Sequence, residues 1–309
     1  MTGAEAGFLL LTGKLGNPER NVLTTAQLRT LAQRVKNAAF PVSDRELECS
    51  DLITLGYSRD MAQRILSLLD DEELLSHYLN RGKRNRCVPL SRISDKYPAV
   101  LRSRLGWDAP GCLWAKGDLS ILTMPAIALV GSRDLQDSNR KFAEEVGRQA
   151  ALQGYAMISG NARGADRTAQ NACLEAGGRV ISIVADELNK QPEQERILWL
   201  SEDGFDEPFS AQRALSRNRC IHALGSKTFV AQCGYQQGGT WDGSVRNLRF
   251  GWSELCCFND GSPAMTLLEQ MGAVLVEKNA LGFYKRLGMS KPDDVLVLNR
   301  IQWTDFTVQ

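Results

Sequence analysis

Apolar residues recur at helical spacing in the first part of the chain. Thr24 and Gln27 match a capping box, and the apolar positions that follow, up to Asn37, are Leu28, Leu31, Ala32 and Val35. The same spacing returns at Met61, Ile65, Leu68 and Leu69. The pattern predicts a small helical domain over residues 1–85.

The pattern changes after residue 125, where short apolar runs alternate with helical segments. The expected strands cover residues 126–130, 155–159, 179–184, 228–232, 255–258 and 273–276. Between the first two, Ser138 is expected to cap a helix whose buried face carries Phe142, Val146 and Ala150. Between the next two, a helix with Ala169 and Cys173 is expected to end at Gly177-Gly178. Such alternation is typical of βαβ units, so we expect an α/β domain over residues 86–285, with a Rossmann-like, mostly parallel sheet and helices on both faces. Residues 286–309 are left as a C-terminal tail.

Composition narrows the class of protein. The 309 residues are 43% hydrophobic and 24% charged, which is typical of a soluble globular chain of about two domains. No apolar run approaches the roughly 18 residues that cross a bilayer, and no signal peptide is evident, so a cytoplasmic protein is expected. The eight cysteines form no CxxC pair and the chain has only two histidines. Metal-centre and Ser/Cys–His hydrolase chemistry are therefore disfavoured, and neither a metal nor a cofactor is expected.

The net charge is +1, so any affinity for nucleic acid must come from local clusters. One such cluster runs from Arg81 to Arg104, where eight Lys and Arg residues stand against the single acid Asp95. This segment is interpreted either as a basic linker or as a surface along which a nucleic-acid strand passes.

Candidate chemistry gathers in the loops that follow the expected strands. In a parallel sheet these loops meet at the carboxyl edge, where helix N-termini converge. One loop carries Gly131-Ser132-Arg133 and the next runs from Ser159 to Asp166 (SGNARGAD). Two further clusters flank the strand at 228–232: Arg213, Arg217, Asn218 and Arg219 before it, and the run from Gly238 to Gly243 after it. Glycines, hydroxyls and guanidinium groups in this arrangement predict phosphate binding.

Two common nucleotide motifs are absent from the sequence. Neither GxGxxG nor GxxxxGK[ST] occurs, so a dinucleotide cofactor and ATP-driven chemistry lose their usual support. Three residues keep two interpretations each: Asp166 as a helix N-terminal residue or a ligand contact, His222 as a core histidine or a catalyst, and Trp241 as a structural anchor or a base-stacking ring.

These motifs together resemble the DprA/Smf (DNA-processing protein A) family of the SLOG superfamily, over roughly residues 9–276. The resemblance rests on DKYPAVL from Asp95, KGDLSIL from Lys116, IALVGSR from Ile127, SGNARGAD from Ser159, Gly177-Gly178, and RNRCIHAL from Arg217. It implies a Rossmann-like core preceded by a helical domain of the SAM or helix-hairpin-helix type.

The resemblance also implies a function. Members of the family bind single-stranded DNA, often as dimers, and pass the strand to a RecA-type recombinase; no catalysis is implied. Matched to this chain, its phosphate contacts fall on Ser132, Arg133, Ser159, Gly160, Arg163, Arg217, Asn218 and Arg219. The loop pattern adds Gly131, Gly164, Arg213, Gly239, Thr240 and Trp241 to the expected site.

The chain departs from the family pattern in three places. The usual aromatic residue before the Arg-Asn pair is replaced by Ala214, and the usual SGSLxTA loop by GGTWDGSVRNL. The C-terminal winged helix that many relatives carry is not expected from this sequence. These features indicate a divergent subgroup, in which a defence-system partner could replace the recombinase. The alternative functions are a SLOG-type nucleotide sensor, an enzyme that cleaves the N-glycosidic bond of a nucleotide, and a structural adaptor. The enzyme is disfavoured because its PGGxGTxxE signature is broken here to QQGGTWDGS.

Overall fold

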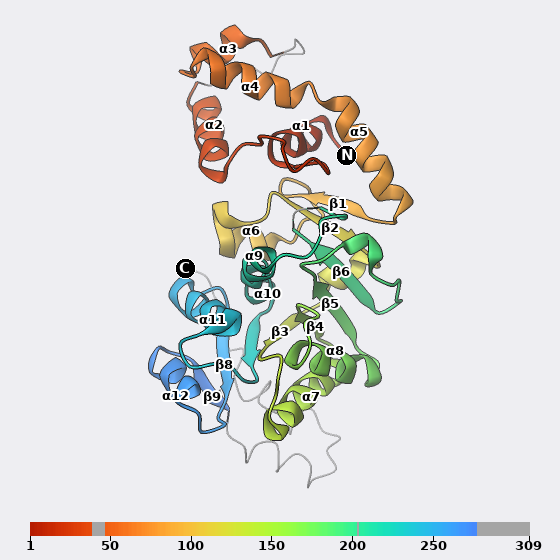
Figure 1. Cartoon of the computed structure of the whole chain (residues 1–309), viewed down its shortest axis with the longest axis vertical. Coiled ribbons are helices and arrows are strands. Elements are labelled where there is room, and N and C mark those ends of the chain that lie inside the picture. The colour runs from red at the N-terminus through yellow and green to blue at the C-terminus, as the bar shows by residue number, and fades with distance from the viewer. Residues whose placement is uncertain (39–46, 203, 277–309) are drawn as a thin grey trace. The chain divides into compact units, whose positions relative to one another are not determined.

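The computed structural model describes residues 1–38, 47–202 and 204–276, which fold into two compact units (Figure 1). Unit 1 contains Met1–Lys116, Asp186–Gln191 and Ser201–Pro208. Unit 2 contains Gly117–Ala185, Pro192–Leu200 and the described residues from Phe209 to Val276. The domain boundary expected at residue 85 stays a prediction. In the structure, residues 1–116 belong to one compact unit. The expected tail, residues 286–309, lies outside the described part of the chain.

Unit 1 begins with helices, as the apolar spacing predicted. They are α1 (Gly3–Thr12), α2 (Thr25–Asn37), α3 (Cys49–Thr54), α4 (Arg59–Leu69) and α5 (Glu72–Arg84). The capping box at the start of α2 is present, with Thr24 and Gln27 bonded to each other's backbone. The apolar faces of α2, α3 and α4 meet in one core cluster that contains Leu31, Leu52, Ile65 and Leu68, and Leu11 of α1 packs against it.

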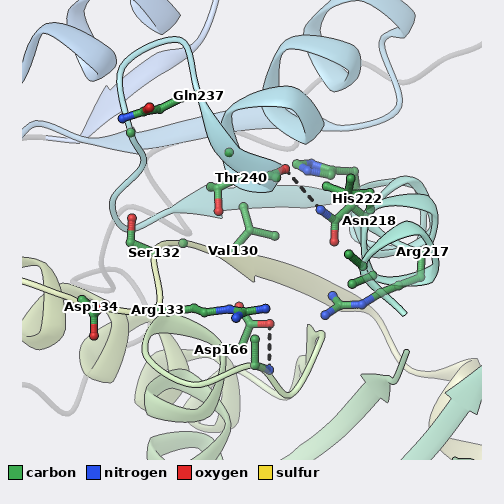
Figure 2. A pocket seen from close by; sticks show the side chains of 18 of the residues that line it. Val130, Ser132, Arg133, Asp134, Asp166, Arg217, Asn218, His222, Gln237 and Thr240 are labelled. Carbon is green, nitrogen blue, oxygen red and sulfur yellow. Dashed lines mark hydrogen bonds between the residues drawn. The ribbon is translucent and has the colours of Figure 1, made fainter. Parts of the chain in front are cut away.

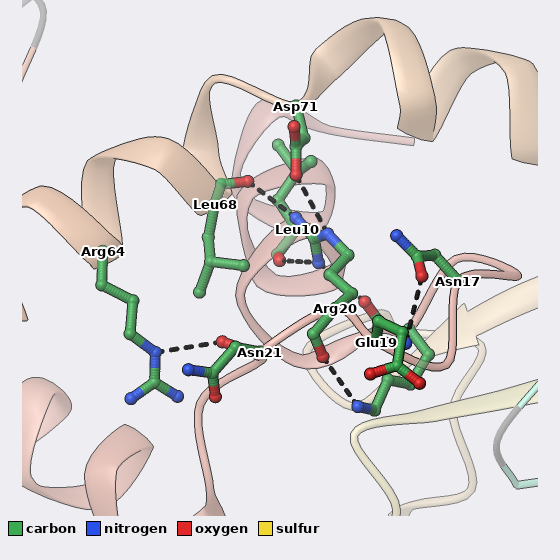
Figure 3. Close-up of polar contacts among 10 residues, drawn as sticks. Leu10, Asn17, Glu19, Arg20, Asn21, Arg64, Leu68 and Asp71 are labelled. Atoms are coloured by element: carbon green, nitrogen blue, oxygen red, sulfur yellow. Dashed lines mark hydrogen bonds and ion pairs between the residues drawn. The ribbon is translucent and has the colours of Figure 1, made fainter.

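A buried arginine holds the loop after α1 (Figure 3). The Arg20 side chain is 4% exposed and forms an ion pair with Asp71 at 3.0 Å. Its guanidinium also donates to the carbonyl oxygens of Leu10 (2.5 Å), Gly13 (2.7 Å) and Leu68 (2.9 Å). These carbonyls would otherwise lack partners where α1 and α4 end, so Arg20 serves as an internal cap for both helices.

The basic segment is part of the fold and not a linker. After α5 it forms β1 (Val88–Ser91) and α6 (Ala99–Leu105), and β1 pairs antiparallel with β2 (Cys112–Lys116). Two of its arginines serve the fold: Arg81 pairs with Asp206 at 2.5 Å, and Arg92 donates to the carbonyl oxygens of Trp107 and Ala109. Neither strand was predicted, because both are short and lie outside the βαβ alternation.

Unit 2 contains the parallel sheet that the sequence predicted. Its strands, in spatial order, are β6 (Ile197–Ser201), β5 (Arg179–Ile183), β4 (Ala156–Ser159), β3 (Ala126–Val130), β7 (Lys227–Val230), β8 (Glu254–Phe258) and β9 (Val274–Val276). The last residue of β6 falls in unit 1. The central strands are almost completely buried, as both faces of a parallel sheet covered by helices should be. Only β6 was missed, since no helical pattern separates it from β5.

The direction of the crossovers reverses at β3. From β3 the chain moves to β4 and β5 through α7 (Asp137–Leu152) and α8 (Ala165–Glu175), and from β7 it moves the other way through α11 (Gly238–Phe250). Right-handed crossovers in opposite directions place these helices on opposite faces of the sheet. Ahead of β7 lie α9 (Ala211–Ser216) and α10 (Asn218–Leu224), and α12 (Pro263–Gln270) follows β8. The boundary between β3 and β7 is therefore the topological switch point, where α/β sheets usually bind ligands.

Helix α7 starts two residues earlier than expected. Its N-cap is Gln136, and Ser138 lies inside the first turn with its hydroxyl donating to Asn139. The prediction that Ser138 caps this helix is wrong, because Gln136 is held at the cap by Gln232, whose side chain accepts the Gln136 N–H at 3.0 Å. Among the described residues, no helix is long and apolar enough to span a bilayer.

Candidate nucleic-acid interface

Three loops meet at the carboxyl edge of the sheet and are tied together by one residue. The Ser132 N–H donates to the carbonyl of Gln232, which follows β7, at 2.8 Å. The Ser132 carbonyl accepts from the N–H of Ala165, at the start of α8, at 3.1 Å. Gly131 makes this approach possible, since a Cβ there would lie 2.5 Å from the Ala165 Cβ. The backbone thus fixes the loops after β3, β4 and β7 in one arrangement.

These loops border a pocket of about 580 Å³ at the switch point. Its lining begins with Val130 at the end of β3, residues 131–134 after that strand, and Ala162 and Asp166 after β4. It continues with Phe209 ahead of α9, Ala211, Ala214 and Leu215 in α9, Arg217 between α9 and α10, and Asn218 and His222 in α10. Gly234 and residues 237–240, after β7, complete it. The sequence predicted that these loops would converge, and the structure brings them together. The expected residues that line this pocket are Gly131, Ser132, Arg133, Arg217, Asn218, Gly239 and Thr240.

Two guanidinium groups and one carboxylate form the base of the pocket. Figure 2 shows Arg133 and Arg217 extending toward Asp166 from opposite sides. Asp166 accepts from the backbone N–H of Gly160 (2.9 Å) and of Ala162 (3.3 Å), so its carboxylate holds the loop after β4 in shape. Burial raises the pKa of Asp166, although the Arg217 charge and these two N–H groups act against the rise. Of the two interpretations, the contacts of Asp166 fit the structural one.

Arg217 requires a glycine opposite it. Its guanidinium donates to the Gly160 carbonyl at 3.0 Å, and a Cβ on Gly160 would lie 1.5 Å from the Arg217 Nη1. Arg217 is 7% exposed, so most of its surface contacts the protein and only an edge faces the pocket. Arg133, by contrast, is exposed and is the more accessible cation.

The opposite wall is the N-terminus of α11. Its N-cap residue, Gln237, makes no side-chain cap, so the first-turn N–H groups of Gly238, Gly239 and Thr240 face the pocket without that partner. The Asn218 side chain donates to the Gly239 carbonyl at 3.2 Å and fixes the turn against α10. A helix N-terminus with glycine at its first positions attracts anions and lets them approach the backbone.

His222 lies in the wall of the pocket and is 1% exposed. Burial lowers its pKa to about 3, so the ring is neutral at physiological pH. Its Nδ1 has no hydrogen-bond partner among the described residues. The packing favours a core histidine over a catalyst.

The rim contains apolar residues that the sequence analysis missed. Phe209 is 58% exposed and Leu215 is 49% exposed, and both border the pocket. Phe209 lies ahead of α9 in a stretch with no periodic pattern, so only the tertiary structure reveals an aromatic ring at this site. It stands near Ala214, the position where the family pattern has an aromatic residue.

The remaining expected residues lie outside the pocket lining. Ser159 is fully buried and accepts a hydrogen bond from Gln170 at 2.7 Å. Arg163 is 72% exposed and pairs with Asp134 at 2.8 Å. Gly164 has a φ of +86°, which permits the tight turn into α8. Arg213 donates to the Ala185 carbonyl at 2.7 Å.

Arg219 and Trp241 belong to a neighbouring pocket. Arg219 donates to the Ser216 carbonyl at 2.6 Å, and Trp241 is 8% exposed inside α11. Such burial fits the anchoring interpretation of Trp241. In the described part of the chain, no three His, Cys, Asp or Glu side chains gather as a metal site would require.

Comparison with known proteins agrees with the motifs. A family model described as DNA recombination-mediator protein A matches residues 89–243, half of the chain. The DNA processing protein DprA of Streptococcus pneumoniae is 29% identical over 234 residues, which cover 71% of this chain and 77% of that protein. Protein Smf of Escherichia coli is 29% identical over 215 residues, covering 66% of this chain and 56% of that protein.

Solved structures show the same fold. The X-ray structure of DNA processing protein A from S. pneumoniae has a TM-score of 0.67 and 26% identity, with 89% of this chain and 95% of that chain covered. The DNA processing protein A of Helicobacter pylori, described for its single-stranded DNA binding mode, has a TM-score of 0.53 and 20% identity, with 65% and 96% covered. With a family model over half of its length and the fold in common, the chain belongs to the DprA/Smf family of DNA-processing proteins.

Proposed function

We propose that this protein binds single-stranded DNA in the switch-point pocket without changing it chemically. The observation that carries the proposal is the combination of three features in one pocket: Arg133 and Arg217, the N-terminus of α11, and the exposed ring of Phe209. Cations and backbone N–H groups bind phosphate, and an exposed ring stacks on a base. A pocket for a single strand needs both a phosphate contact and a base contact.

Each side of the pocket would contact a different part of the strand. A backbone phosphate would lie between Arg133 and the first-turn N–H groups of α11, where the charge and the helix dipole act together. The adjoining base would rest against Phe209 and Leu215, whose apolar surface does not select among bases. Binding would therefore be nearly independent of sequence. The relative from H. pylori, described as binding single-stranded DNA, supports this proposal.

We further propose that the bound strand is protected, or is handed to a RecA-type recombinase or a defence-system protein, and that the protein works as a homodimer in the cytoplasm. The family membership supports a role in DNA processing. The exposed residues of the site leave the strand reachable by a second protein.

A free nucleotide is the second candidate ligand, because the pocket volume of about 580 Å³ lies in the range for small ligands. Hydrolysis of its glycosidic bond would need a carboxyl group beside that bond. Among the described lining residues the carboxylates are Asp134 and Asp166, and they are engaged with Arg163 and with two backbone N–H groups. A nucleotide sensor therefore fits the pocket better than an enzyme does.

Titration of the full chain with labelled dT20, a duplex of the same length and free nucleotides, at two salt concentrations, separates these functions. We expect tight, salt-dependent binding of dT20 and weak binding of the other ligands. Tight binding of a free nucleotide, with none of dT20, would establish the sensor instead.

Arg133→Ala is the first variant to compare. A charge-assisted contact to phosphate contributes on the order of 1.5–3 kcal/mol, so we expect dT20 affinity to fall roughly ten- to hundredfold. Arg163→Ala should cost less, since Asp134 already neutralises part of its charge. Arg179→Ala is the control: Arg179 is an exposed arginine at the first residue of β5, on the amino edge of the sheet. Equal affinities in the Arg133 and Arg179 variants would contradict the assignment of the pocket.

Phe209→Ala tests the base contact. Loss of a stacking ring should reduce dT20 affinity by about 1–3 kcal/mol, while the melting temperature stays near that of the wild type because the ring is exposed. Phe209→Trp should retain or strengthen binding, and indifference to both changes would show that no base rests there.

A further inference from the structure

A second pocket lies beside the first and shares a wall with it. Its volume is about 340 Å³, and Leu215, Asn218 and Gly239 line both pockets. The wall is only one hydrogen-bonded layer thick, since the Asn218 side chain donates directly to the Gly239 carbonyl. Leu215, which lines both pockets, is 49% exposed.

The second pocket is built from aromatic rings and guanidinium groups. Trp241 and Trp252 form its walls, and Arg219 and Arg246 border it. The Arg246 guanidinium carbon lies 5.7 Å from the centroid of the Trp252 ring. Arg246 is exposed, and no carboxylate in the described part of the chain forms an ion pair with it, although the exposed Asp242 also lines the pocket. Its charge is therefore available to a ligand.

The same chemistry continues past the pocket along the end of α11. Phe250 is 54% exposed and stacks on Trp252, with ring centroids 5.4 Å apart and planes 15° from parallel. The Arg249 guanidinium carbon lies 5.3 Å from the Phe250 ring. The two rings thus stack on each other with one guanidinium group beside each, Arg246 at Trp252 and Arg249 at Phe250. Packing explains the buried Trp252, but it does not explain an exposed phenyl ring beside the exposed Arg249.

We propose that this second pocket and the adjoining Phe250 form a second subsite for single-stranded nucleic acid, which takes the nucleotides that follow those in the first pocket. Arginines spaced along stacked rings suit a ligand in which phosphates alternate with planar bases. An apolar peptide would not use the guanidinium groups. The inference rests on the proposed function, and it assigns to α11 a role along its whole length rather than only at its N-terminus.

The test compares Arg246→Gln with Arg179→Gln, which removes the same charge at the exposed first residue of β5, outside the lining of both pockets, and adds Phe250→Leu to remove the ring but keep an apolar side chain. We expect Arg246→Gln to bind dT20 about three- to tenfold more weakly than the wild type. The slope of log K against log salt should fall by about 0.7, the value for removal of one phosphate contact on a single strand. Phe250→Leu should weaken binding about fivefold or more without changing that slope.

The outcomes are separable from those of the first pocket. If the wild type does not bind dT20, the proposed function and this inference both fail. A second outcome starts from a wild type that binds dT20 and an Arg133→Ala variant that binds it more weakly. If Arg246→Gln and Phe250→Leu then both match Arg179→Gln in affinity and in slope, the strand uses the first pocket alone. The proposal of a second subsite is wrong in that case. Thermal melts accompany every variant, and the unchanged slope of Phe250→Leu distinguishes the removal of a stacking ring from the removal of a charge.

Discussion

At the scale of single residues, Arg20 holds together more of the backbone around it than any surface arginine could. Its buried guanidinium bonds three backbone carbonyls and pairs with Asp71, so Arg20→Ala leaves several acceptors without a partner. Buried acceptors left unsatisfied cost about 1–3 kcal/mol each, and we expect unit 1 to lose about 3–5 kcal/mol of unfolding free energy. Arg64, which reaches the carbonyls of Asn21 and Val22 from a less buried position, is the comparison visible in Figure 3. Urea unfolding should show a clearly smaller loss for Arg64→Ala; equal losses would contradict the role given to Arg20.

His222 gives a prediction about pH. Its pKa falls from 6.5 in the unfolded chain to about 3 in the folded protein, because burial penalises the charged ring. Between these values the unfolded state binds more protons, so stability is complete above pH 6.5 and is lost as the pH falls toward 3. This residue should contribute up to about 1.4 kcal/mol per pH unit in that window. Urea unfolding at pH 4.5, 5.5 and 7.5 should show a shallower decline in His222→Gln, and parallel declines would exclude His222 as the cause.

At the scale of elements, α7 and α8 depend on one close approach. A Cβ on Gly147 would lie 2.1 Å from the Ala169 carbonyl oxygen, which is backbone and cannot move aside cheaply. Alanine improves helix propensity by about 1 kcal/mol over glycine, but overpacking costs about 1–3 kcal/mol, and a distance this short belongs at the upper end. We expect Gly147→Ala to lose about 1–2 kcal/mol net. Gly3→Ala in α1, where nothing lies within 4 Å of the added Cβ, should be neutral or slightly stabilising in the same unfolding experiment.

At the scale of the whole molecule, a bound DNA strand could contact unit 1 as well as the pocket in unit 2. Lys83, Arg84 and Arg86 are exposed at the end of α5 in unit 1. If the strand contacts this segment as well, neutralising all three should lower the slope of log K against log salt by about 0.7 for each phosphate that these side chains bind. Titration of the triple variant with dT20 at four salt concentrations measures the slope, and a slope equal to that of the wild type would confine binding to unit 2.

The sequence by itself determined the elements and their class. The capping box at Thr24 and Gln27, the apolar spacing and the alternation after residue 125 depend on local geometry, so they predicted α2, α4 and six strands of the parallel sheet. The motifs at Ile127, Ser159 and Arg217 predicted the family and the loops of the site, because glycine and arginine are needed wherever backbone and phosphate approach closely.

Only the tertiary structure decided which side chains face the pocket. Ser159 and Asp166 lie in the predicted loop, yet the structure turns their oxygens toward Gln170 and two backbone N–H groups. Phe209 and Phe250 carry no local signal, because exposure depends on what the rest of the chain leaves uncovered. Local sequence determines the backbone of each loop through short-range sterics and hydrogen bonds. The direction of a side chain depends on partners far along the chain. Those partners come into contact with it only when the sheet forms, with β3 beside β7.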